Sequence, residues 1–270
     1  MLWTRSSINE LIHSLRSCLC VGLDTDINKL PEGIQKSPDG ILTFNKAIVD
    51  YTFQYAVAYK INAAFYEVLG GKGWDIMSET IEYIRMRNRF AILDAKRGDI
   101  GNTGDMYAKS AFEYLRADAV TVAPYMGKDS VMPFLNYKKN WTILLGLTSN
   151  PGADDFQMKK LTDDSHLFEE VIQKAITWGD PDHLMFVTGA TRTDYLKKIR
   201  TIAPDYFLLI PGVGAQGGEL NKVLESSLTK NGDILINASR SIIYASSKAD
   251  FAKAAEAESH RMQAEMAKFI

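Results

Sequence analysis

The sequence predicts an α/β fold in which eight parallel strands close into a single (β/α)8 TIM barrel. Short apolar runs of strand type recur eight times along the 270 residues, and stretches of helical periodicity alternate with them. No linker rich in proline, in glycine and serine, or in one sign of charge divides the chain. Barrels of this class often reach ~250 residues as one domain. We therefore expect one domain over residues 1–270, and favour a barrel over a doubly wound open sheet.

The expected elements follow one another in a regular order. Aliphatic, aromatic and β-branched residues predict strands at 18–23, 55–60, 90–93, 119–122, 142–147, 184–187, 207–210 and 234–236. Apolar residues at helical spacing predict helices at 44–52, 74–85, 103–114, 167–178, 193–202 and 248–268. Glycines at 70–71 and the Gly-Asp-Pro sequence at 179–181 mark connections. Thr103 is the expected N-cap of the helix at 103–114.

The longest connection without a predicted element runs from residue 149 to residue 164. It begins with Ser-Asn-Pro-Gly and directly follows a predicted strand. Loops of this length in compact folds are often functional lids. We expect this segment to lie beside the site, because barrels of this class keep their sites at the strand ends.

Composition excludes several classes of function. With 46% apolar residues, 24% charged residues and a net charge of −2, the chain is typical of a soluble globular protein without a nucleic-acid or membrane partner. No signal-peptide pattern is present, and no run approaches the ~20 apolar residues of a membrane span. Cys18 and Cys20 are expected to pack in the core rather than to form a disulfide. These features favour a reducing, cytoplasmic location.

Ionisable residues recur at the ends of the first three predicted strands. Asp24 and Lys60 stand at the first two ends, and Asp94 and Lys96 at the third. Residues two apart on a strand point to the same side, so Asp94 and Lys96 share a face. The carboxyl ends of barrel strands form the active face, and the pattern therefore predicts a charged site. A salt-bridge network that only ties the strands together is the alternative.

The carboxylates around Lys96 indicate its chemical state. Asp94 and Asp99 flank this lysine, and nearby negative charge favours the ammonium form. A Schiff-base lysine would need a neutral amine instead. We therefore expect Lys96 to donate a proton, with Lys60 completing an alternating array of lysines and aspartates. The four histidines lie away from predicted strand ends, which argues against histidine catalysis and a histidine-based metal site.

Two segments near the end of the chain predict a phosphate site. The glycine-rich segment 210–218 follows the seventh predicted strand, and Asn-Ala-Ser-Arg-Ser at 237–241 follows the eighth. Barrels that bind phosphate use these two loops. Arg240 would supply a bidentate charge and Gln216 an amide donor. Tight turns with a surface arginine are the alternative reading.

The same glycine-rich segment contains a second pattern. Gly212, Gly214 and Gly217 match G-x-G-x-x-G, the fingerprint of dinucleotide-binding folds. That fingerprint belongs after the first strand of its fold, with an acidic residue at the end of the next strand. Here it follows the seventh strand, and Asp233 precedes the next strand instead. The position argues against dinucleotide binding.

Taken together, these motifs resemble orotidine 5'-phosphate decarboxylases, and among them the longer bacterial (type 2) subgroup. The most specific match is Asp94-x-Lys96-x-x-Asp99-Ile100 with Thr103. Further matches occur in the family's order at 22–24, 60–62, 148–152, 211–216 and 237–240. The resemblance implies a homodimeric barrel that converts orotidine 5'-monophosphate to uridine 5'-monophosphate and CO2 in pyrimidine synthesis. It implies no metal and no organic cofactor.

The resemblance also implies roles for individual residues. Lys96 would protonate C6 of the pyrimidine, with Asp94 against the departing carboxylate. Lys60 and Asp24 would hold the ribose hydroxyls and complete the charged array. The other residues implied to bind substrate are Ser149 at the pyrimidine and Gln216 and Arg240 at the phosphate. Asp99, as a catalytic residue, and Thr103, as a substrate-binding residue, would reach the neighbouring subunit's site.

Two other functions remain open from the sequence. A sugar-phosphate decarboxylase or aldolase of the same barrel type shares Asp-x-Lys-x-x-Asp but uses Mg²⁺ to stabilise an enediolate. A catalytically idle nucleotide-binding barrel is the second alternative. The crowded charges argue against it, because a binder of a uridine-type ligand gains nothing from a lysine and two carboxylates at C6.

Overall fold

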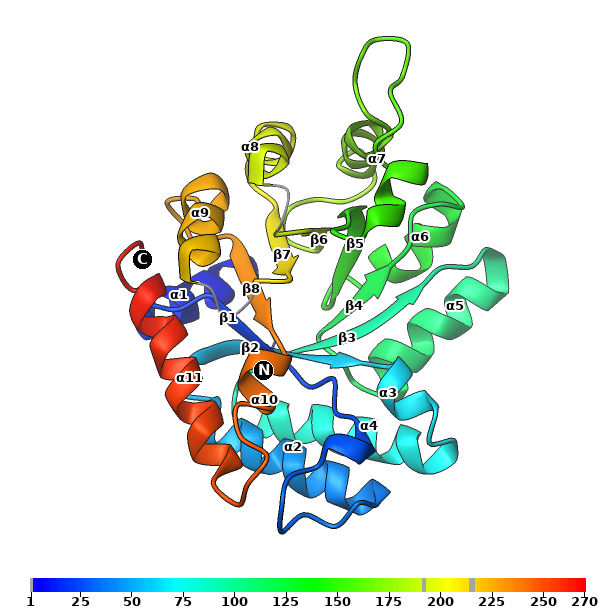
Figure 1. The fold of residues 1–270 in the computed structure, drawn as a ribbon. Helices are drawn as coiled ribbons and strands as arrows, with labels where there is room; N and C mark the ends of the chain where they lie inside the picture. The colour runs from blue at the N-terminus through cyan, green and yellow to red at the C-terminus, as the bar shows by residue number, and fades with distance from the viewer. Residues whose placement is uncertain (1, 191–192, 214–216) are drawn as a thin grey trace.

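Eight parallel strands form a closed barrel in the order β1 to β8, with β8 pairing back to β1. The computed structural model describes residues 2–190, 193–213 and 217–270 (Figure 1). The strands are β1 (Leu19–Gly22), β2 (Ala56–Asn62), β3 (Phe90–Arg97), β4 (Ala119–Val122), β5 (Trp141–Leu147), β6 (Leu184–Thr188), β7 (Phe207–Pro211) and β8 (Ile234–Ala238). Each predicted strand overlaps one of these, so the predicted TIM barrel is confirmed.

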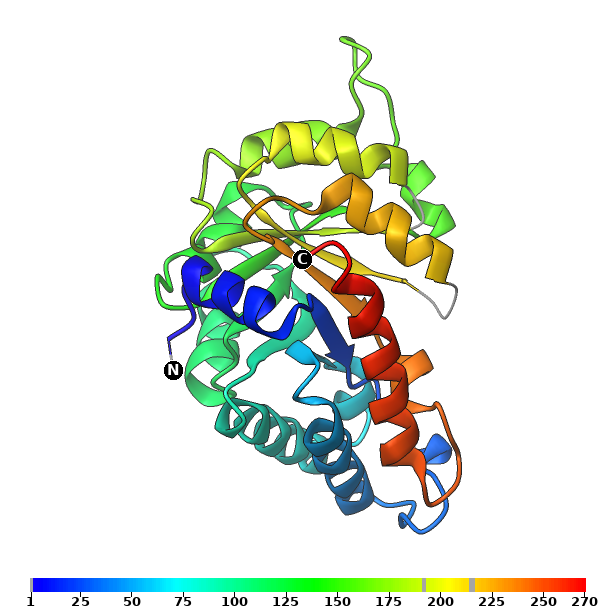
Figure 2. The same cartoon turned by 90° about the vertical axis from the view of Figure 1, so that its left-hand side faces the viewer.

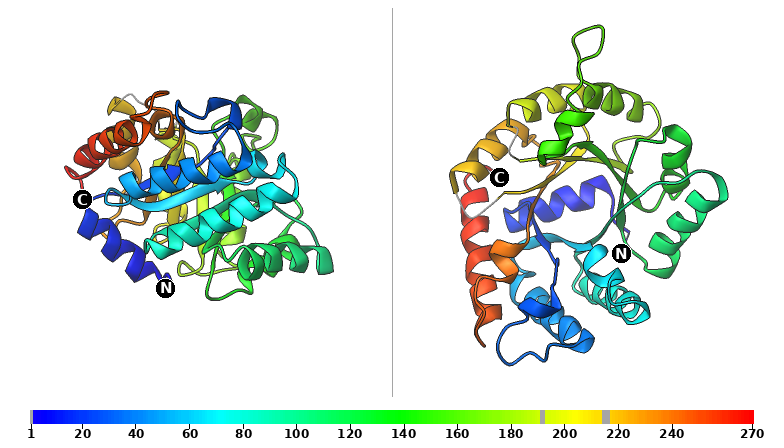
Figure 3. Two further views of the ribbon diagram at one scale, coloured as in Figure 1. Left: turned by 90° about the horizontal axis from the view of Figure 1, so that it is seen from below. Right: turned by 45° about the vertical axis from the view of Figure 1, so that its right-hand side comes forward.

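Helices surround the strands and cover the outer face of the barrel (Figure 3). They are α1 (Arg5–Leu15), α2 (Pro38–Thr52), α3 (Ala64–Glu67), α4 (Gly71–Met86), α5 (Gly101–Lys109), α6 (Lys128–Leu135), α7 (Leu167–Ala175), α8 (Thr193–Ile202), α9 (Gly217–Ser227), α10 (Arg240–Ile243) and α11 (Phe251–Met266). The last of them, α11, packs between α9 and α2 and completes the outer ring (Figure 2). No helix in the part of the chain that the structure describes is long and apolar enough to cross a membrane.

The amino-terminal end of the barrel is filled by aromatic side chains. Trp141 on β5 meets the rings of Phe90 and Phe207 nearly edge-on, with ring centroids 6.4 and 6.0 Å apart. Trp3 packs against Phe90, and its carbonyl accepts the indole N–H of Trp141 at 2.9 Å. The core therefore closes this end, and the carboxyl ends of the strands are left for a site.

Helix α5 begins earlier than predicted. Its N-cap is Ile100, and Thr103 lies inside the helix, so the prediction of Thr103 as the cap was wrong. Gly101, with φ at 55°, turns the chain into the helix directly after the loop. A π-helical segment (Ser110–Tyr114) then continues the helix over the rest of the predicted range.

The connection between β5 and α7 has more structure than predicted. A 3₁₀ helix (Pro151–Asp155) follows its first residues, and Lys160 forms an antiparallel bridge with His166. The segment before α7 projects from the barrel as a long loop (Figure 1). The start of the connection, at Ser149 and Asn150, lines the cavity described below.

Candidate active site

A cavity of about 480 Å³ opens at the carboxyl ends of the strands. Charged side chains at the first three strand ends line it, together with residues from the loops after β5, β7 and β8. The lining residues are Asp24, Lys60, Asn62, Asp94, Lys96, Thr121, Leu145, Thr148, Ser149, Asn150, Val187, Leu209, Pro211, Gly212, Val213, Asn237, Ser239, Arg240 and Ser241.

The structure brings the four predicted charges of the first three strand ends together. Lys60 Nζ lies 2.8 Å from Asp94 Oδ2 and 3.5 Å from Asp24 Oδ1. Lys96 Nζ lies 2.6 Å from the other oxygen, Asp94 Oδ1. The backbone places these groups, because the parallel register sets Gly22 beside Lys60 and Asn62 beside Asp94. Lysines and aspartates therefore alternate along the cavity wall.

Burial and charge act in opposite directions on this array. Burial by itself would raise the pKa of Asp94, but the ammonium groups of Lys60 and Lys96 outweigh it and lower that pKa to about 2. Burial would likewise lower the pKa of Lys60, and the carboxylates of Asp94 and Asp24 raise it instead. Both groups are therefore charged near neutral pH.

The two lysines differ in exposure. The side chain of Lys60 is only 6% exposed and that of Asp94 is 9% exposed, whereas that of Lys96 is 51% exposed. Lys60 is thus enclosed between two carboxylates. Lys96 is the cation of this array that a bound molecule and water can both reach, which suits a group that must give up and regain a proton.

Another part of the cavity wall comes from the predicted phosphate loops. Arg240 follows β8 and lines the cavity, as does Gly212, whose φ of 92° favours glycine. Gly22 of β1 passes so close to this wall that a Cβ there would lie 1.8 Å from Ser239 Oγ. Gln216, the other predicted phosphate ligand, lies outside the described residues.

Ser149 enters the cavity from the loop after β5. A Cβ on Gly189 would lie within 2.9 Å of three Ser149 atoms, so glycine at the end of β6 leaves room for this serine. Thr148 beside it exchanges hydrogen bonds with the Gln157 side chain, which joins the two ends of the 3₁₀ segment. Ser149, the predicted pyrimidine-contacting residue, therefore lies between the close backbone of Gly189 and the hydrogen-bonded Thr148.

Two predicted site residues lie outside this chain's own cavity. Asp99 accepts the amide N–H of Ile100 at 2.8 Å, and within the described ranges it forms no ion pair with Lys96. Of the two carboxylates expected to hold Lys96 as an ammonium, Asp94 contacts its Nζ in this chain, and Asp99 is not among the residues that line the cavity. Thr103 is exposed on α5.

Thr121, a polar residue of the cavity lining, was missed by the sequence reasoning. Thr121 of β4 donates a hydrogen bond to Asp94 Oδ1 at 3.0 Å and accepts the amide N–H of Lys96 at 2.9 Å. A possible signal was present, since this residue is the only polar one in the strand Ala-Val-Thr-Val. Nothing in the local pattern showed that the hydroxyl faces Asp94.

Cysteines and histidines lie elsewhere. Cys18 and Cys20 are buried and free, as predicted for core residues. The cavity lining contains no histidine among the residues the structure describes. Over the same ranges, no three His, Cys, Asp or Glu side chains form a group that could hold a metal ion.

Comparisons with known proteins agree on a single family. The family model of orotidine 5'-phosphate decarboxylase / HUMPS proteins matches residues 17–255. Orotidine 5'-phosphate decarboxylase of Porphyromonas gingivalis is 53% identical over 265 residues, covering 97% of this chain and 96% of that protein. The enzyme of the same name from Christiangramia forsetii is 52% identical over 266 residues, covering 98% and 97%.

The solved structures extend this likeness to the fold. The structure of Leishmania donovani OMP decarboxylase superposes with a TM-score of 0.83 at 35% identity, covering 98% of this chain and 99% of that chain. The sequence match therefore holds for the barrel as a whole. Since the family model spans most of the chain and the relatives are about half identical over nearly their full length, the chain belongs to the orotidine 5'-phosphate decarboxylase / HUMPS family.

Proposed function

We propose that this protein is an orotidine 5'-phosphate decarboxylase, which converts orotidine 5'-monophosphate to uridine 5'-monophosphate and CO2. The observation that carries the proposal is the array of Lys60, Asp94 and Lys96 in the cavity of a barrel of this family. Relatives with this name cover almost the whole chain. The activity is that of a carboxy-lyase.

The reaction needs a positioned cation. When the bond between C6 and the carboxylate breaks, its electron pair stays on C6 as a localised carbanion with no π system to accept it. Lys96 is suited to stabilise this charge and then to transfer a proton from Nζ to C6. The neutral amine that results regains its proton from water, which reaches Lys96 because half of its side chain is exposed.

The other residues hold the substrate. Asp94 would lie against the departing carboxylate, Lys60 and Asp24 would bind the ribose hydroxyls, and Ser149 would meet the pyrimidine. Arg240, with Gln216, would bind the phosphate. Binding energy from this distant phosphate can be used to orient the base, so a substrate without phosphate should lose turnover rate as well as affinity.

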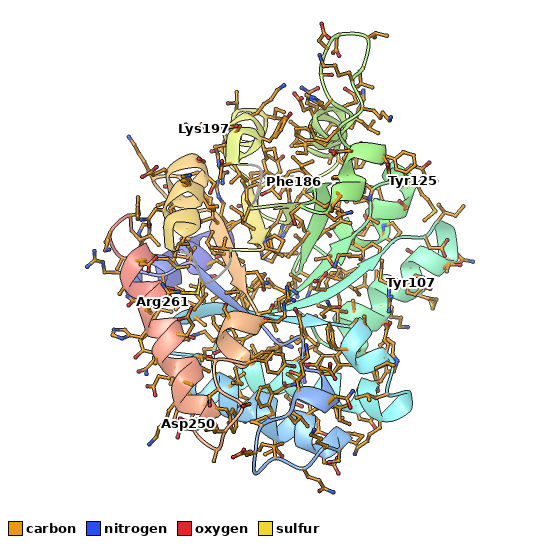
Figure 4. All side chains as sticks on the ribbon, viewed as in Figure 1. Tyr107, Tyr125, Phe186, Lys197, Asp250 and Arg261 are labelled. Carbon is orange, nitrogen blue, oxygen red and sulfur yellow. The ribbon has the colours of Figure 1, made fainter. Side chains whose placement is uncertain are left out.

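We further propose a homodimer with shared sites. Asp99 and Thr103 lie outside their own cavity, beside exposed apolar side chains on and near α5. Ile100 is 52% exposed there, and Tyr107 and Tyr125 lie at the same edge of the molecule (Figure 4). A second copy of the chain packing on this edge would bring Asp99 and Thr103 to its cavity, and would cover the apolar surface.

A spectroscopic assay tests the function. Purified protein mixed with orotidine 5'-monophosphate should remove the orotate-type absorbance and yield uridine 5'-monophosphate and CO2 in equal amounts. No loss of absorbance would contradict the proposal. The same assay after EDTA treatment tests the metal-free reaction: retained turnover excludes a Mg²⁺-dependent sugar-phosphate decarboxylase or aldolase, and turnover abolished by EDTA and restored by Mg²⁺ would overturn our mechanism.

A further inference from the structure

We propose that Thr121 is a positioning residue for this reaction, whose hydroxyl fixes both the Asp94 carboxylate and the backbone that aims Lys96 into the cavity. The inference rests on the proposed function and deepens it. It is carried by three observations on the described residues: a bulge in β3, two hydrogen bonds to one hydroxyl, and the burial of that hydroxyl.

The bulge lies between the two key residues of the array. On β3 the register with β4 passes from Leu93 beside Val120 to Arg97 beside Val122, so four residues of β3 advance against two of β4. Lys96 has φ at 48°, in the left-handed region that a residue with a side chain rarely adopts. Bulges redirect side chains near active sites, and this one turns Lys96 toward the cavity.

Thr121 lies opposite the bulge and satisfies the backbone there. A bulge interrupts the ladder of backbone hydrogen bonds, and the amide N–H of Lys96 is donated to Thr121 Oγ1 at 2.9 Å instead. Because Thr121 is 1% exposed, water has little access to replace this acceptor. The hydroxyl therefore stabilises a backbone conformation that is costly without it.

The same hydroxyl also holds the catalytic carboxylate. A threonine hydroxyl has one hydrogen, and here it is donated to Asp94 Oδ1 at 3.0 Å. Lys96 Nζ contacts that oxygen at 2.6 Å. A closed loop results, in which the amide and the ammonium of Lys96 are both tied to Asp94 Oδ1, one through Thr121 and one directly. Removing the hydroxyl would remove its hydrogen bonds with the Lys96 amide and with Asp94 Oδ1, and would leave only the direct contact between Lys96 Nζ and Asp94.

The loss should appear in turnover rather than in substrate binding. Among the described residues, the Thr121 hydroxyl bonds to Asp94 and Lys96 and not to Asp24 or Arg240, which are proposed to hold the ribose and the phosphate. Catalysis is sensitive to displacements of the reacting groups that barely change affinity. We therefore expect Thr121→Val to lower kcat roughly 10- to 100-fold while KM and the affinity for uridine 5'-monophosphate stay within about threefold.

Two further variants make the experiment specific to the hydroxyl. Thr121→Ser keeps the hydroxyl and should keep kcat within about threefold of the wild-type value. Thr142→Val is the matched control on the neighbouring strand β5. Thr142 is also 1% exposed, but its hydroxyl has no hydrogen-bond partner among the residues described, so its loss should leave kcat unchanged. Melting curves of all three variants report folding.

The outcomes separate this inference from the proposed function. If the wild-type protein does not decarboxylate orotidine 5'-monophosphate, the function itself fails. If the wild type is active and Thr121→Val has an unchanged kcat, only the role of Thr121 is overturned. If Thr121→Val fails to fold, Thr121→Ser still decides: a loss of kcat beyond tenfold in that variant contradicts a role carried by the hydroxyl.

Discussion

Lys60 and Lys96 are both lysines of the charged array, but they differ in how far their side chains are buried. Lys60 contacts Asp24 and Asp94 and is almost fully enclosed, so its ammonium is committed to holding the two carboxylates. Lys96 contacts Asp94 only through Oδ1 and remains half-exposed toward the cavity. Exposure, rather than side-chain chemistry, therefore distinguishes Lys96, the proposed proton donor, from Lys60.

Replacing Lys96 by alanine should abolish turnover without loss of the fold. The side chain is half-exposed, so little packing is lost, whereas the cation and the proton both disappear. Turnover of orotidine 5'-monophosphate, the affinity for uridine 5'-monophosphate and the melting temperature would be measured together. Lys174→Ala on α7, another exposed lysine, is the control. Near-normal turnover in Lys96→Ala would refute the assigned role.

Replacing Arg240 by alanine should act mainly on substrate affinity. Arg240 lines the cavity and is proposed to bind phosphate, so loss of its guanidinium should raise KM about 10- to 100-fold, with a smaller fall in kcat. Arg261→Ala removes a guanidinium on α11 that pairs with Glu258 and Glu265, and should leave KM unchanged (Figure 4). Steady-state kinetics distinguishes the two, and an unaltered KM in Arg240→Ala would count against the phosphate site.

At the scale of the elements, a buried carboxylate joins β3 to β4 at the closed end of the barrel. Asp118 precedes β4, and its Oδ2 accepts the amide N–H of Ala91 on β3 at 3.0 Å. Burial raises the pKa of Asp118 to about 6, because the Ala91 amide and Arg85, 3.5 Å away on α4, only partly offset the loss of water. This contact joins β3, which carries Asp94 and Lys96, to β4, which carries Thr121.

The raised pKa of Asp118 predicts a pH dependence of stability. The folded state holds this proton up to about pH 6, whereas the unfolded state loses it near pH 4. The protonated carboxyl therefore favours folding at low pH, and this contribution to stability is lost as pH rises between these values. Asp118→Asn keeps an acceptor for Ala91 and cannot ionise. Urea unfolding should show the wild type losing about 1–3 kcal/mol relative to Asp118→Asn across this window. Parallel stability curves would contradict the expectation.

At the scale of the whole molecule, the proposed dimer with shared sites makes a distinctive prediction. Lys96→Ala and Asp99→Ala should each be inactive alone, because every site then lacks one group. In a mixed dimer one of the two sites receives Lys96 from one protomer and Asp99 from the other, so refolding an equal mixture should restore about a quarter of the wild-type activity. Sedimentation would confirm the dimer. A mixture that stays inactive while dimers form would rule out shared sites.

The sequence predicted much of this architecture because the signals are local. Strand-forming residues and the helical spacing of apolar residues can be recognised within short stretches of the chain. These patterns located every strand of the barrel. The predicted strand ends then indicated the charged array, because Asp24, Lys60 and Asp94 stand at strand ends and barrels of this class keep their sites there. The start of α5 was missed because Gly101 and Thr103 offer competing local signals, and the backbone at Gly101 decided between them.

What the sequence determined by itself was the alternation of elements, the identity of the charged residues and the family they resemble. Only the tertiary structure decided how those residues meet. Closure of the barrel sets the register between β3 and β4, and this register creates the bulge that turns Lys96 and places Thr121 opposite it. The tertiary structure also leaves Asp99 outside the lining of its own cavity. Register arises from pairing between strands distant in the chain, so no local pattern could specify it.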